Sequence, residues 1–408
     1  MKCGLIARGE RQRGIGVQSR EYAAHLDPDR VLVIDVGEHE QYPIHPEDFE
    51  RATVVRMASD GTLPEGMVRK WLHGLDVVLF IETPMDWRLC NWAREQGVRT
   101  ANHQNPEFYR HGQHRLPHPD GWWAPTTWRL EHLPAGTRVV PVPVAVERFK
   151  RRTVARRGQP IRFLHPVGKW SAYDRNGTET FVRACYLTQR GVPLDTTITC
   201  LHPLPHECAP GGDWVKVEIG GVENYWDAYD GYDVMVMPRR YGGLNLPTQE
   251  AMAAGLAVVM PDISPNTDWP IVPVAAQYAG KAPMPCGQVP LAEVSPNQLA
   301  EVMRRLAGSP RELAQWRERS VAWAEAHSWE KLTPLYMDEL QRVIDEPIPP
   351  PRVEHDPFAA RSARQRPRAE PEPRVVPRQR ERRAEPSVPQ PAVRRPRARQ
   401  RCSGPSLR

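Results

Sequence analysis

The segment Tyr241–Gly255 combines two glycines, a proline and a glutamate in an order that suits the binding of an anion. It follows an apolar run, Asp233–Met237, which we interpret as a buried strand. Pro247 suits the first position of a helix, whose free backbone N–H groups attract an anion such as a diphosphate. Glu250 in the first helical turn could accept hydrogen bonds from sugar hydroxyls. The alternative is a turn and a helix whose glutamate only complements the helix dipole.

Two cations, Lys169 and Arg175, follow another apolar run, Ile161–Val167. A pair of cations beside a diphosphate would neutralise its charge as the bond to the leaving group breaks, and would do so without a metal. The alternative is a solvated charged loop, which is the usual fate of lysine and arginine side chains. Beside Glu250, we favour the first interpretation.

The N-terminal loop Arg8–Gly16 lies between a predicted strand and a predicted helix. Gly14 and Gly16 form a short glycine pattern that is either part of a phosphate-binding loop or a flexible turn. Glu82 and Asp86 follow a third apolar run. One of them could orient an acceptor hydroxyl, and Asp86 could instead cap a helix.

Histidines and cysteines lie close together at two places, but neither group has the spacing of a zinc site. We therefore expect no metal and no cofactor. The tryptophans before the predicted crossover between domains are expected to pack rather than to stack on a sugar. The two groups are His202, His206 and Cys208, and His111, His114 and His118; the tryptophans are Trp122, Trp123 and Trp128.

Strand and helix signals alternate along the chain, which indicates βαβ units and doubly wound parallel sheets. A second alternating block begins at Pro160, after a proline-punctuated stretch, so we expect two domains that meet near 145–160. The predicted strands are Cys3–Ala7, Arg30–Val36, Asp76–Ile81, one entered at Gly97, Ile161–Val167, Asp195–Leu201, Trp214–Ile219, Asp233–Met237 and Ala257–Met260. The predicted helices are Val17–Leu26, Trp87–Gln96, Thr178–Gln189, Tyr225–Tyr229, Pro247–Ala254, Gln298–Ala307, Glu312–Ala326 and Lys331–Ile344.

The charge of the chain is concentrated in its C-terminal segment. The whole chain of 408 residues carries a formal charge of +6, but residues 346–408 carry 16 arginines, 14 prolines and seven acidic residues, or +9. The remainder is therefore at −3, and the basic pI is no argument that the folded part binds nucleic acid. We expect the tail to be disordered. The seven cysteines form no CxxC pair, and no apolar stretch is long enough to span a membrane or to serve as a signal peptide, which favours a cytoplasmic protein.

The segment Tyr241–Gly255 resembles the donor-binding signature of retaining glycosyltransferases of the GT4 family (glycosyl transferases group 1). The family's first glutamate falls on Gly242 and its second glycine on Asn245, so this sequence departs from the pattern where the family contacts the donor sugar. The spacing of Lys169 and Arg175 also resembles the family's diphosphate clamp, with the two residue types exchanged. The matching positions are Leu246, Pro247, Glu250, Ala251, Met252, Ala253 and Gly255.

This resemblance implies a GT-B fold, in which two Rossmann-like domains face each other across a cleft. It implies an acceptor domain at 1–150, a nucleotide-sugar domain at 151–330, a closing helix at 331–345 that returns to the first domain, and the tail at 346–408. His103 would contact a sugar hydroxyl, and Glu250 would bind the ribose. With the sugar contacts Arg239 and Arg240, the implied site comprises Gly16, His103, Gly168, Lys169, Arg175, Gly242, Gly243, Leu244, Asn245, Leu246 and Glu250.

The implied reaction moves a sugar from a nucleotide-diphosphate sugar to an acceptor hydroxyl, with retention and without metal. The acceptor is open: a glycan, a protein or a modified DNA base. The resemblance extends to proteins of actinobacterial bacteriophages, which adds virion components as acceptors and the host cytoplasm as a location. Two alternatives remain. The chain could bind sugar nucleotides or glycans without catalysis, because the first glutamate is missing. The basic tail could also hold nucleic acid by charge, making DNA the acceptor.

Overall fold

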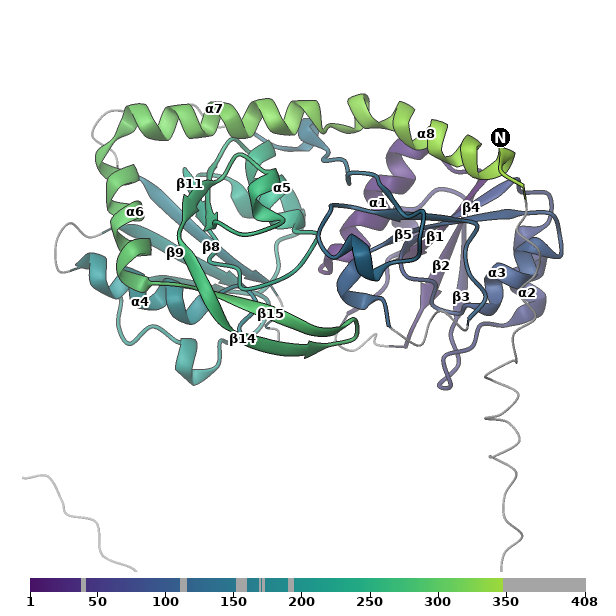
Figure 1. Cartoon of the computed structure of the whole chain (residues 1–408), viewed down its shortest axis with the longest axis horizontal. Helices are drawn as coiled ribbons and strands as arrows, with labels where there is room; N and C mark the ends of the chain where they lie inside the picture. The colour runs from purple at the N-terminus through teal and green to yellow at the C-terminus, as the bar shows by residue number, and fades with distance from the viewer. Residues whose placement is uncertain are drawn as a thin grey trace, which may run out of the picture. The chain divides into compact units, whose positions relative to one another are not determined.

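The computed structural model describes residues 1–37, 42–110, 116–151, 160–168, 170, 173–189 and 194–347, all within the unit Met1–Pro357. Lys169 and most of the basic tail lie outside these residues. The described part contains two parallel sheets and one antiparallel hairpin, and we call each sheet with its helices a lobe (Figure 1). None of its helices is long and apolar enough to cross a membrane.

The first sheet has the strand order β3-β2-β1-β4-β5-β6-β7, and all of its pairs are parallel. Its strands are β1 (Cys3–Arg8), β2 (Arg30–Asp35), β3 (Ala52–Arg56), β4 (Val77–Glu82), β5 (Arg99–Gln104), β6 (Gly121–Ala124) and β7 (Arg138–Val139). Its helices are α1 (Gly14–Leu26), α2 (Glu65–Leu72), α3 (Arg88–Arg94) and, from the end of the described chain, α8 (Trp329–Asp345).

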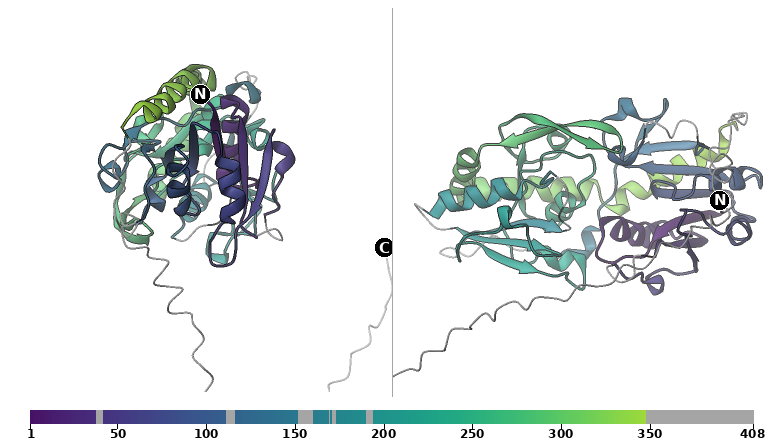
Figure 2. Two further views of the ribbon diagram at one scale, coloured as in Figure 1. Left: turned by 90° about the vertical axis from the view of Figure 1, so that its right-hand side faces the viewer. Right: turned by 90° about the horizontal axis from the view of Figure 1, so that it is seen from below.

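Alternate residues of the first sheet serve two separate cores, as a sheet covered on both faces requires. Leu5 and Val33 pack on one face against Tyr22 of α1 and Tyr336 of α8. The opposite face packs against α2 and α3. Helix α8 therefore belongs to the first lobe although α7 precedes it in the second, and Figure 2 shows it beside the first sheet.

The second sheet has the order β10-β9-β8-β11-β12-β13 and is also parallel throughout. Its strands are β8 (Arg162–Gly168), β9 (Asp195–Cys200), β10 (Lys216–Ile219), β11 (Val234–Val236), β12 (Ala257–Pro261) and β13 (Val272–Val274). Its helices are α4 (Thr178–Gln189), α5 (Leu246–Ala253), α6 (Pro296–Gly308) and α7 (Pro310–Ala326).

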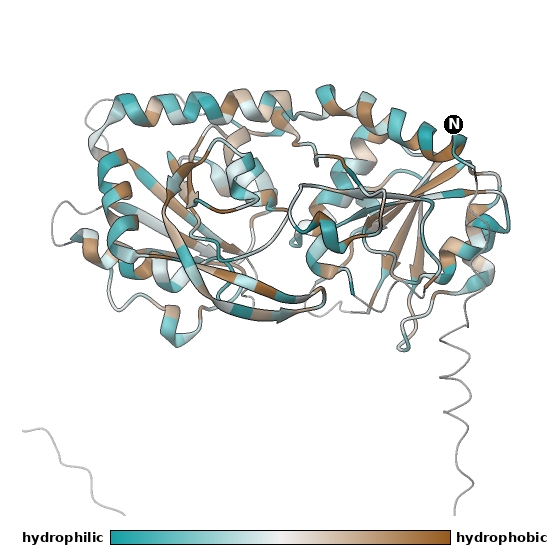
Figure 3. Cartoon of the chain, viewed as in Figure 1, coloured by the Kyte–Doolittle hydropathy of each residue, from teal (hydrophilic) through white to brown (hydrophobic). Residues whose placement is uncertain are grey.

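Helices α4 and α6 cover one face of the second sheet, and α5 and α7 cover the other. Hydrophobic residues, brown in Figure 3, are frequent along the strands of both sheets. The antiparallel hairpin of β14 (Ala276–Met284) and β15 (Gly287–Val294) is an element that the sequence did not lead us to expect. Two doubly wound parallel sheets confirm the predicted α/β architecture.

Candidate active site

Most of the predicted site residues that the structure describes follow strands at the point where each sheet reverses its order. His103, inside β5, is an exception. In the first sheet this point lies between β1 and β4, and in the second between β8 and β11. Open α/β sheets bind ligands at such points, because the loops after neighbouring strands diverge there. The loops of the two lobes also touch, since Arg175 of the second lobe pairs with Glu107 of the first at 2.6 Å. The sequence therefore places two ligand-binding edges against each other.

The loop after β1 is shorter than predicted, because α1 already begins at Gly14. Gly16 is thus a residue of the first helical turn and not of a flexible loop. A Cβ atom at Gly16 would lie 1.8 Å from the backbone oxygen of Glu10, so only glycine lets the helix approach the loop. Arg8, the last residue of β1, forms a buried ion pair with Glu10 of this loop, and Glu10 Oε2 has no hydrogen-bond partner in the described part of the chain.

The loop between β11 and α5 is held in shape by Arg239. Its guanidinium is buried and donates hydrogen bonds to the backbone oxygens of Tyr241 and Leu244, each at 2.9 Å. Burial and the neighbouring Arg175 cation lower the pKa of Arg239. Through these two hydrogen bonds Arg239 shapes the loop around Gly242 and Gly243. Its predicted contact with a sugar stays a prediction.

Arg240 joins three segments. Its side chain donates hydrogen bonds to the backbone oxygens of Tyr173 and Ala292, and its backbone N–H donates to the backbone oxygen of Arg175 at 2.8 Å. These bonds connect the β11–α5 loop to the hairpin and to the loop after β8. Arg240 therefore acts on the position of Arg175, and its predicted sugar contact likewise stays a prediction.

Helix α5 begins at Leu246, one residue earlier than predicted. Asn245, the residue before it, is not in the helical conformation. Glu250 is thus the fifth residue of the helix and not part of its first turn. Asn245 is buried and donates a hydrogen bond to Thr248 Oγ1 at 2.7 Å. Leu244 and Leu246 pack against the core of the first lobe, so this loop also holds the two lobes together.

Glu250 faces the junction of the lobes. Its Oε2 accepts a hydrogen bond from Tyr229 at 2.5 Å, and it lines a small cavity with Glu21 of α1 and Tyr225. The cavity has a volume of about 20 Å³, which is room for about one water molecule. Oε1 of the neighbouring Gln249 is buried without a hydrogen-bond partner in the described structure. Polar groups thus line this cavity, and one of their oxygens is unsatisfied.

Burial raises the pKa of Glu250 to about 7. The hydrogen bond from Tyr229 lowers it and the Glu21 carboxylate raises it, both by less than burial. The ordinary value is 4.5, so the unfolded chain loses this proton at a lower pH than the folded protein does. The carboxylate form consequently opposes folding, and the stability of the protein falls as pH rises from about 4.5 to about 7.

We expect Glu250→Gln, compared with the unchanged protein, to be more stabilising at pH 8 than at pH 5. The difference between 4.5 and about 7 corresponds to at most about 3 kcal/mol in the free energy of unfolding. Urea unfolding at the two pH values measures it. The exposed Glu301 on α6 provides the control, because Glu301→Gln should act equally at both pH values. An equal effect of Glu250→Gln at pH 5 and pH 8 would contradict this expectation.

The loop after β8 brings Arg175 to the site. Asp174 caps α4 by accepting hydrogen bonds from the backbone N–H groups of Thr178 at 2.8 Å and Glu179 at 2.9 Å. Gly168 is exposed with φ +61°, a conformation that favours glycine. Lys169 lies outside the described residues, so its pairing with Arg175 across a diphosphate stays a prediction. Nε of Arg175 is buried and has no hydrogen-bond partner among the described residues.

Glu107 is a site residue that the sequence reasoning missed. It belongs to a short 3-10 helix, Pro106–Phe108, just after β5, and it is 1% exposed. Its Oε1 accepts the hydrogen bond from Arg175, and its Oε2 has no partner within the described chain. Like Glu82, Glu107 is an acidic residue near the carboxyl end of a buried strand, but this signal does not reveal its contact with Arg175.

His103 lies inside the first lobe. Its Nδ1 is 2.8 Å from the hydroxyl of Tyr22 and 3.3 Å from that of Tyr336, and the ring of Trp123 packs edge-on against it. Burial lowers the pKa of His103 to about 3, so the imidazole is neutral at physiological pH. This enclosure favours a packing role. Its Nε2 is buried without a hydrogen-bond partner among the described residues, and the contact with a sugar hydroxyl stays a prediction.

The two acidic residues after β4 differ in their surroundings. Asp86 accepts hydrogen bonds from the backbone N–H groups of Leu63 and Arg88 and pairs with the Arg88 side chain, so it organises the start of α3. Glu82 has a φ of +71°, and the Asn105 amide donates to it at 3.3 Å. Burial raises the pKa of Glu82 to about 7. Glu82 is therefore the better of the two to face an acceptor hydroxyl.

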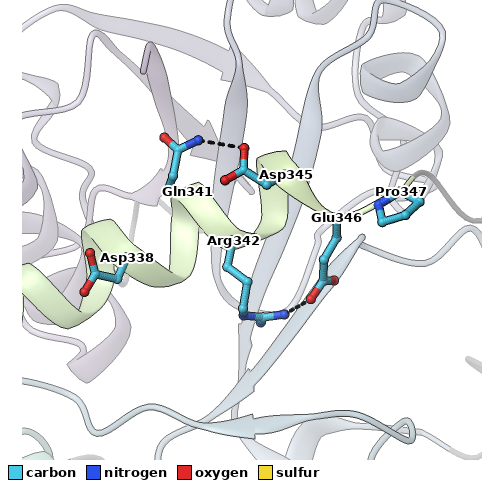
Figure 4. Close-up of a pocket in the computed structure, with 6 residues that line it drawn as sticks. All are labelled: Asp338, Gln341, Arg342, Asp345, Glu346 and Pro347. Carbon is cyan, nitrogen blue, oxygen red and sulfur yellow. Dashed lines mark hydrogen bonds and ion pairs between the residues drawn. The ribbon is translucent and has the colours of Figure 1, made fainter.

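One group of described residues has the geometry for a metal: Glu21, His25 and Glu147. The guanidinium of Arg148 already pairs with the Glu21 carboxylate at 2.7 Å and so supplies positive charge at this point. A further pocket, of about 440 Å³, lies at the end of α8 (Figure 4). Two pairs of its side chains bind each other, Gln341 with Asp345 and Arg342 with Glu346, and no predicted site residue lines it. Neither feature adds to the site.

No protein-family model and no curated protein matches the sequence. Solved structures match it at low identity. HepE of Anabaena in complex with UDP has a TM-score of 0.59 at 12% identity, covering 84% of this chain and 100% of that one. Sucrose-phosphate synthase of Thermosynechococcus elongatus has a TM-score of 0.56 at 15% identity, covering 84% and 98%. The lipopolysaccharide outer core galactosyltransferase WaaB has 0.55 at 12%, covering 84% and 99%. These matches confirm the GT-B fold.

Proposed function

We propose that this protein is a glycosyltransferase that takes a sugar from a nucleotide-diphosphate sugar. The observation that carries the proposal is the meeting of the two sheet reversals, where the loop bearing Arg175 and the helix bearing Glu250 approach the first lobe. The solved structures with this fold include HepE bound to UDP and to UDP-glucose, which supports the same donor class here.

In the proposed reaction Arg175, together with Lys169, neutralises the diphosphate as it leaves. Glu250 accepts hydrogen bonds from the ribose hydroxyls, and the raised pKa of its carboxyl group falls as those hydroxyl donors favour the charged form. We assign the chain to the retaining, GT4-like enzymes on the segment Tyr241–Gly255. Same-face attack, in which a donor phosphate oxygen takes the acceptor proton, suits a site whose functional groups are cations and carboxylates that accept hydrogen bonds from hydroxyls.

The acceptor approaches from the first lobe, where Glu82 stands at the end of β4. We propose a hydroxyl of a glycan, a protein or a modified DNA base as the acceptor. The donor phosphate would remove its proton, and Glu82 would orient it. The two lobes must close on the donor to exclude water, which would otherwise hydrolyse it.

Glu250→Ala is expected to weaken the binding of UDP, GDP or ADP, whichever the protein prefers, by about 10-fold to 100-fold. The reason is that hydrogen bonds to a charged group contribute about 1.5–3 kcal/mol each. Calorimetry with the three nucleotides measures the dissociation constants. Glu301→Ala, on the exposed side of α6, is the control and should bind as the unchanged protein does.

The experiment separates the proposed function from its alternatives. If no nucleotide diphosphate and no nucleotide sugar binds, the proposal is wrong. If a nucleotide sugar binds but no nucleotide diphosphate is released with any acceptor, the chain is a binding protein without catalysis. The absence of the motif glutamate at Gly242 is the observation that favours this second candidate.

A further inference from the structure

We infer that Glu107 of the first lobe accepts a hydrogen bond from a hydroxyl of the donor sugar, in place of the carboxylate that position 242 lacks. The inference rests on the proposed function, because it names a contact within the same donor site. It adds a residue that lies outside the Tyr241–Gly255 segment and on the other lobe. Three features of the described chain carry it: the crowding at Gly242, the position of Glu107 and the unsatisfied atoms of its ion pair.

Position 242 has no room for a carboxylate side chain. A Cβ atom built on Gly242 would lie 2.2 Å from Nη2 of Arg239 and 2.4 Å from Nη2 of Arg175. The backbone at Gly242 also has a φ of +126°, which disfavours any residue with a side chain. The two guanidiniums thus occupy the space that a side chain would need. A sugar-binding carboxylate at this edge must come from elsewhere.

Glu107 reaches the same loop from the opposite lobe. A Cβ atom built on the next residue, Gly243, would lie 3.3 Å from Glu107 Oε2 and 3.5 Å from Cδ of Pro106. The nearest atom is Cε3 of Trp128, at 3.0 Å, so Trp128 and Glu107 both lie against the backbone of the β11–α5 loop. The carboxylate thus lies beside Gly243, the residue that follows position 242, and Glu107 is 1% exposed.

The ion pair of Glu107 and Arg175 leaves one hydrogen-bond acceptor and one hydrogen-bond donor without a partner among the described residues. Oε2 of Glu107 is a buried acceptor and Nε of Arg175 a buried donor, and neither has a hydrogen-bond partner in the described part of the chain. Buried polar atoms are rarely left unpaired, since each costs about 1–3 kcal/mol. A sugar diphosphate supplies what both lack: a hydroxyl hydrogen for the carboxylate and a phosphate oxygen for the guanidinium. Movement of the loop or of the lobes must open the way to them.

In the inferred complex, the nucleotide diphosphate contacts the second lobe and the sugar contacts Glu107 of the first lobe. Arg175 and Glu250, which would hold the nucleotide diphosphate, belong to the second lobe, whereas Glu107 belongs to the first. A nucleotide without its sugar therefore loses no contact when Glu107 is changed. A nucleotide sugar loses one. The ratio of the two affinities reports the proposed contact, and a general loosening of the lobes would weaken both ligands together.

Glu107→Gln tests the inference by calorimetry with the preferred nucleotide diphosphate and its nucleotide sugar. We expect the preference for the nucleotide sugar over the diphosphate to fall by at least about 10-fold. Binding of the diphosphate should stay equal or become tighter, because Arg175 is released from its partner. Glu339→Gln is the matched control: Glu339 of α8 is also a buried glutamate paired with arginines, Arg138 and Arg342, and the change should leave the ratio as it is.

An unchanged ratio in a folded Glu107→Gln protein would overturn the inference, and so would an equal loss of both affinities. If the unchanged protein binds neither ligand, the proposed function itself has failed, which is a different result. Glu107→Asp serves if the glutamine variant does not fold. This variant keeps a negative charge near Arg175, but its shorter side chain moves the carboxylate away from the sugar. We expect the same fall in the ratio, and an unchanged ratio in this variant would also overturn the inference.

Discussion

Gly16→Ala is expected to destabilise the protein by more than about 4 kcal/mol, or to prevent its first lobe from folding. The added methyl group would lie 1.8 Å from the backbone oxygen and 2.7 Å from the carbonyl carbon of Glu10. A backbone carbonyl cannot move aside as the end of a side chain can. Either α1 must withdraw from the sheet or the loop that carries the Arg8–Glu10 ion pair must be rebuilt, and both changes disrupt the core around Tyr22.

Gly14→Ala is the matched control for this prediction. Gly14 begins the same helix, and a Cβ atom there meets only Leu246 Cδ1 at 3.5 Å, an ordinary van der Waals distance. Alanine in a helix is favoured over glycine, so this variant should be as stable as the unchanged protein or more stable by up to about 1 kcal/mol. Urea unfolding and circular dichroism measure both variants. Similar stabilities for the two would show that the close approach at Gly16 does not limit the fold.

The Gly16 variant also tests the site, because α1 takes part in it. Gln18, Glu21 and Tyr22 of this helix line the cavity beside Glu250. If α1 withdraws, that cavity opens and the contacts between α1 and α5 are lost. We therefore expect any folded fraction of Gly16→Ala to bind nucleotide more weakly than Gly14→Ala does, and calorimetry on the folded fraction measures this.

The central strands of both sheets were predictable from the sequence because they are almost wholly apolar, whereas β3 and β13 were not predicted. Val77–Glu82 and Val234–Val236 are buried on both faces, and such strands contrast sharply with the loops around them. Thr178–Gln189 was predicted with the bounds that the structure shows. The hairpin β14–β15 was not predicted, because β14 mixes exposed and half-buried positions and contains Gly280 and Pro283, which disguise a strand.

The candidate site was predictable only where one segment of the sequence contains both the functional side chain and the loop that positions it. Glu250 and Arg175 lie in such segments. Glu107 does not reveal itself in this way, because its role depends on a contact between residues 68 positions apart. The reason for glycine at position 16 is also a tertiary one. The sequence shows that a glycine is present, but the carbonyl that it must pass becomes visible only in the folded chain.

Gly242→Ala is expected to weaken the binding of a nucleotide sugar by about 100-fold and to destabilise the protein by about 2–4 kcal/mol. The new methyl group would displace the guanidiniums of Arg239 and Arg175. Side-chain ends usually move at little cost, but these two are anchored. Arg239 holds the backbone oxygens of Tyr241 and Leu244, and Arg175 holds Glu107. The change therefore breaks the loop's own hydrogen bonds together with the contact between the lobes.

Gly136→Ala separates this displacement from simple backbone strain. Gly136 also has a positive φ, +85°, but a Cβ atom there has nothing within 4 Å. Its alanine variant should lose about 1 kcal/mol of stability from strain and should bind the nucleotide sugar normally. Calorimetry and urea unfolding on both variants give the comparison. Normal nucleotide-sugar binding by Gly242→Ala would mean that the donor does not use this loop, because the guanidiniums of Arg239 and Arg175 cannot keep their positions beside a side chain at 242.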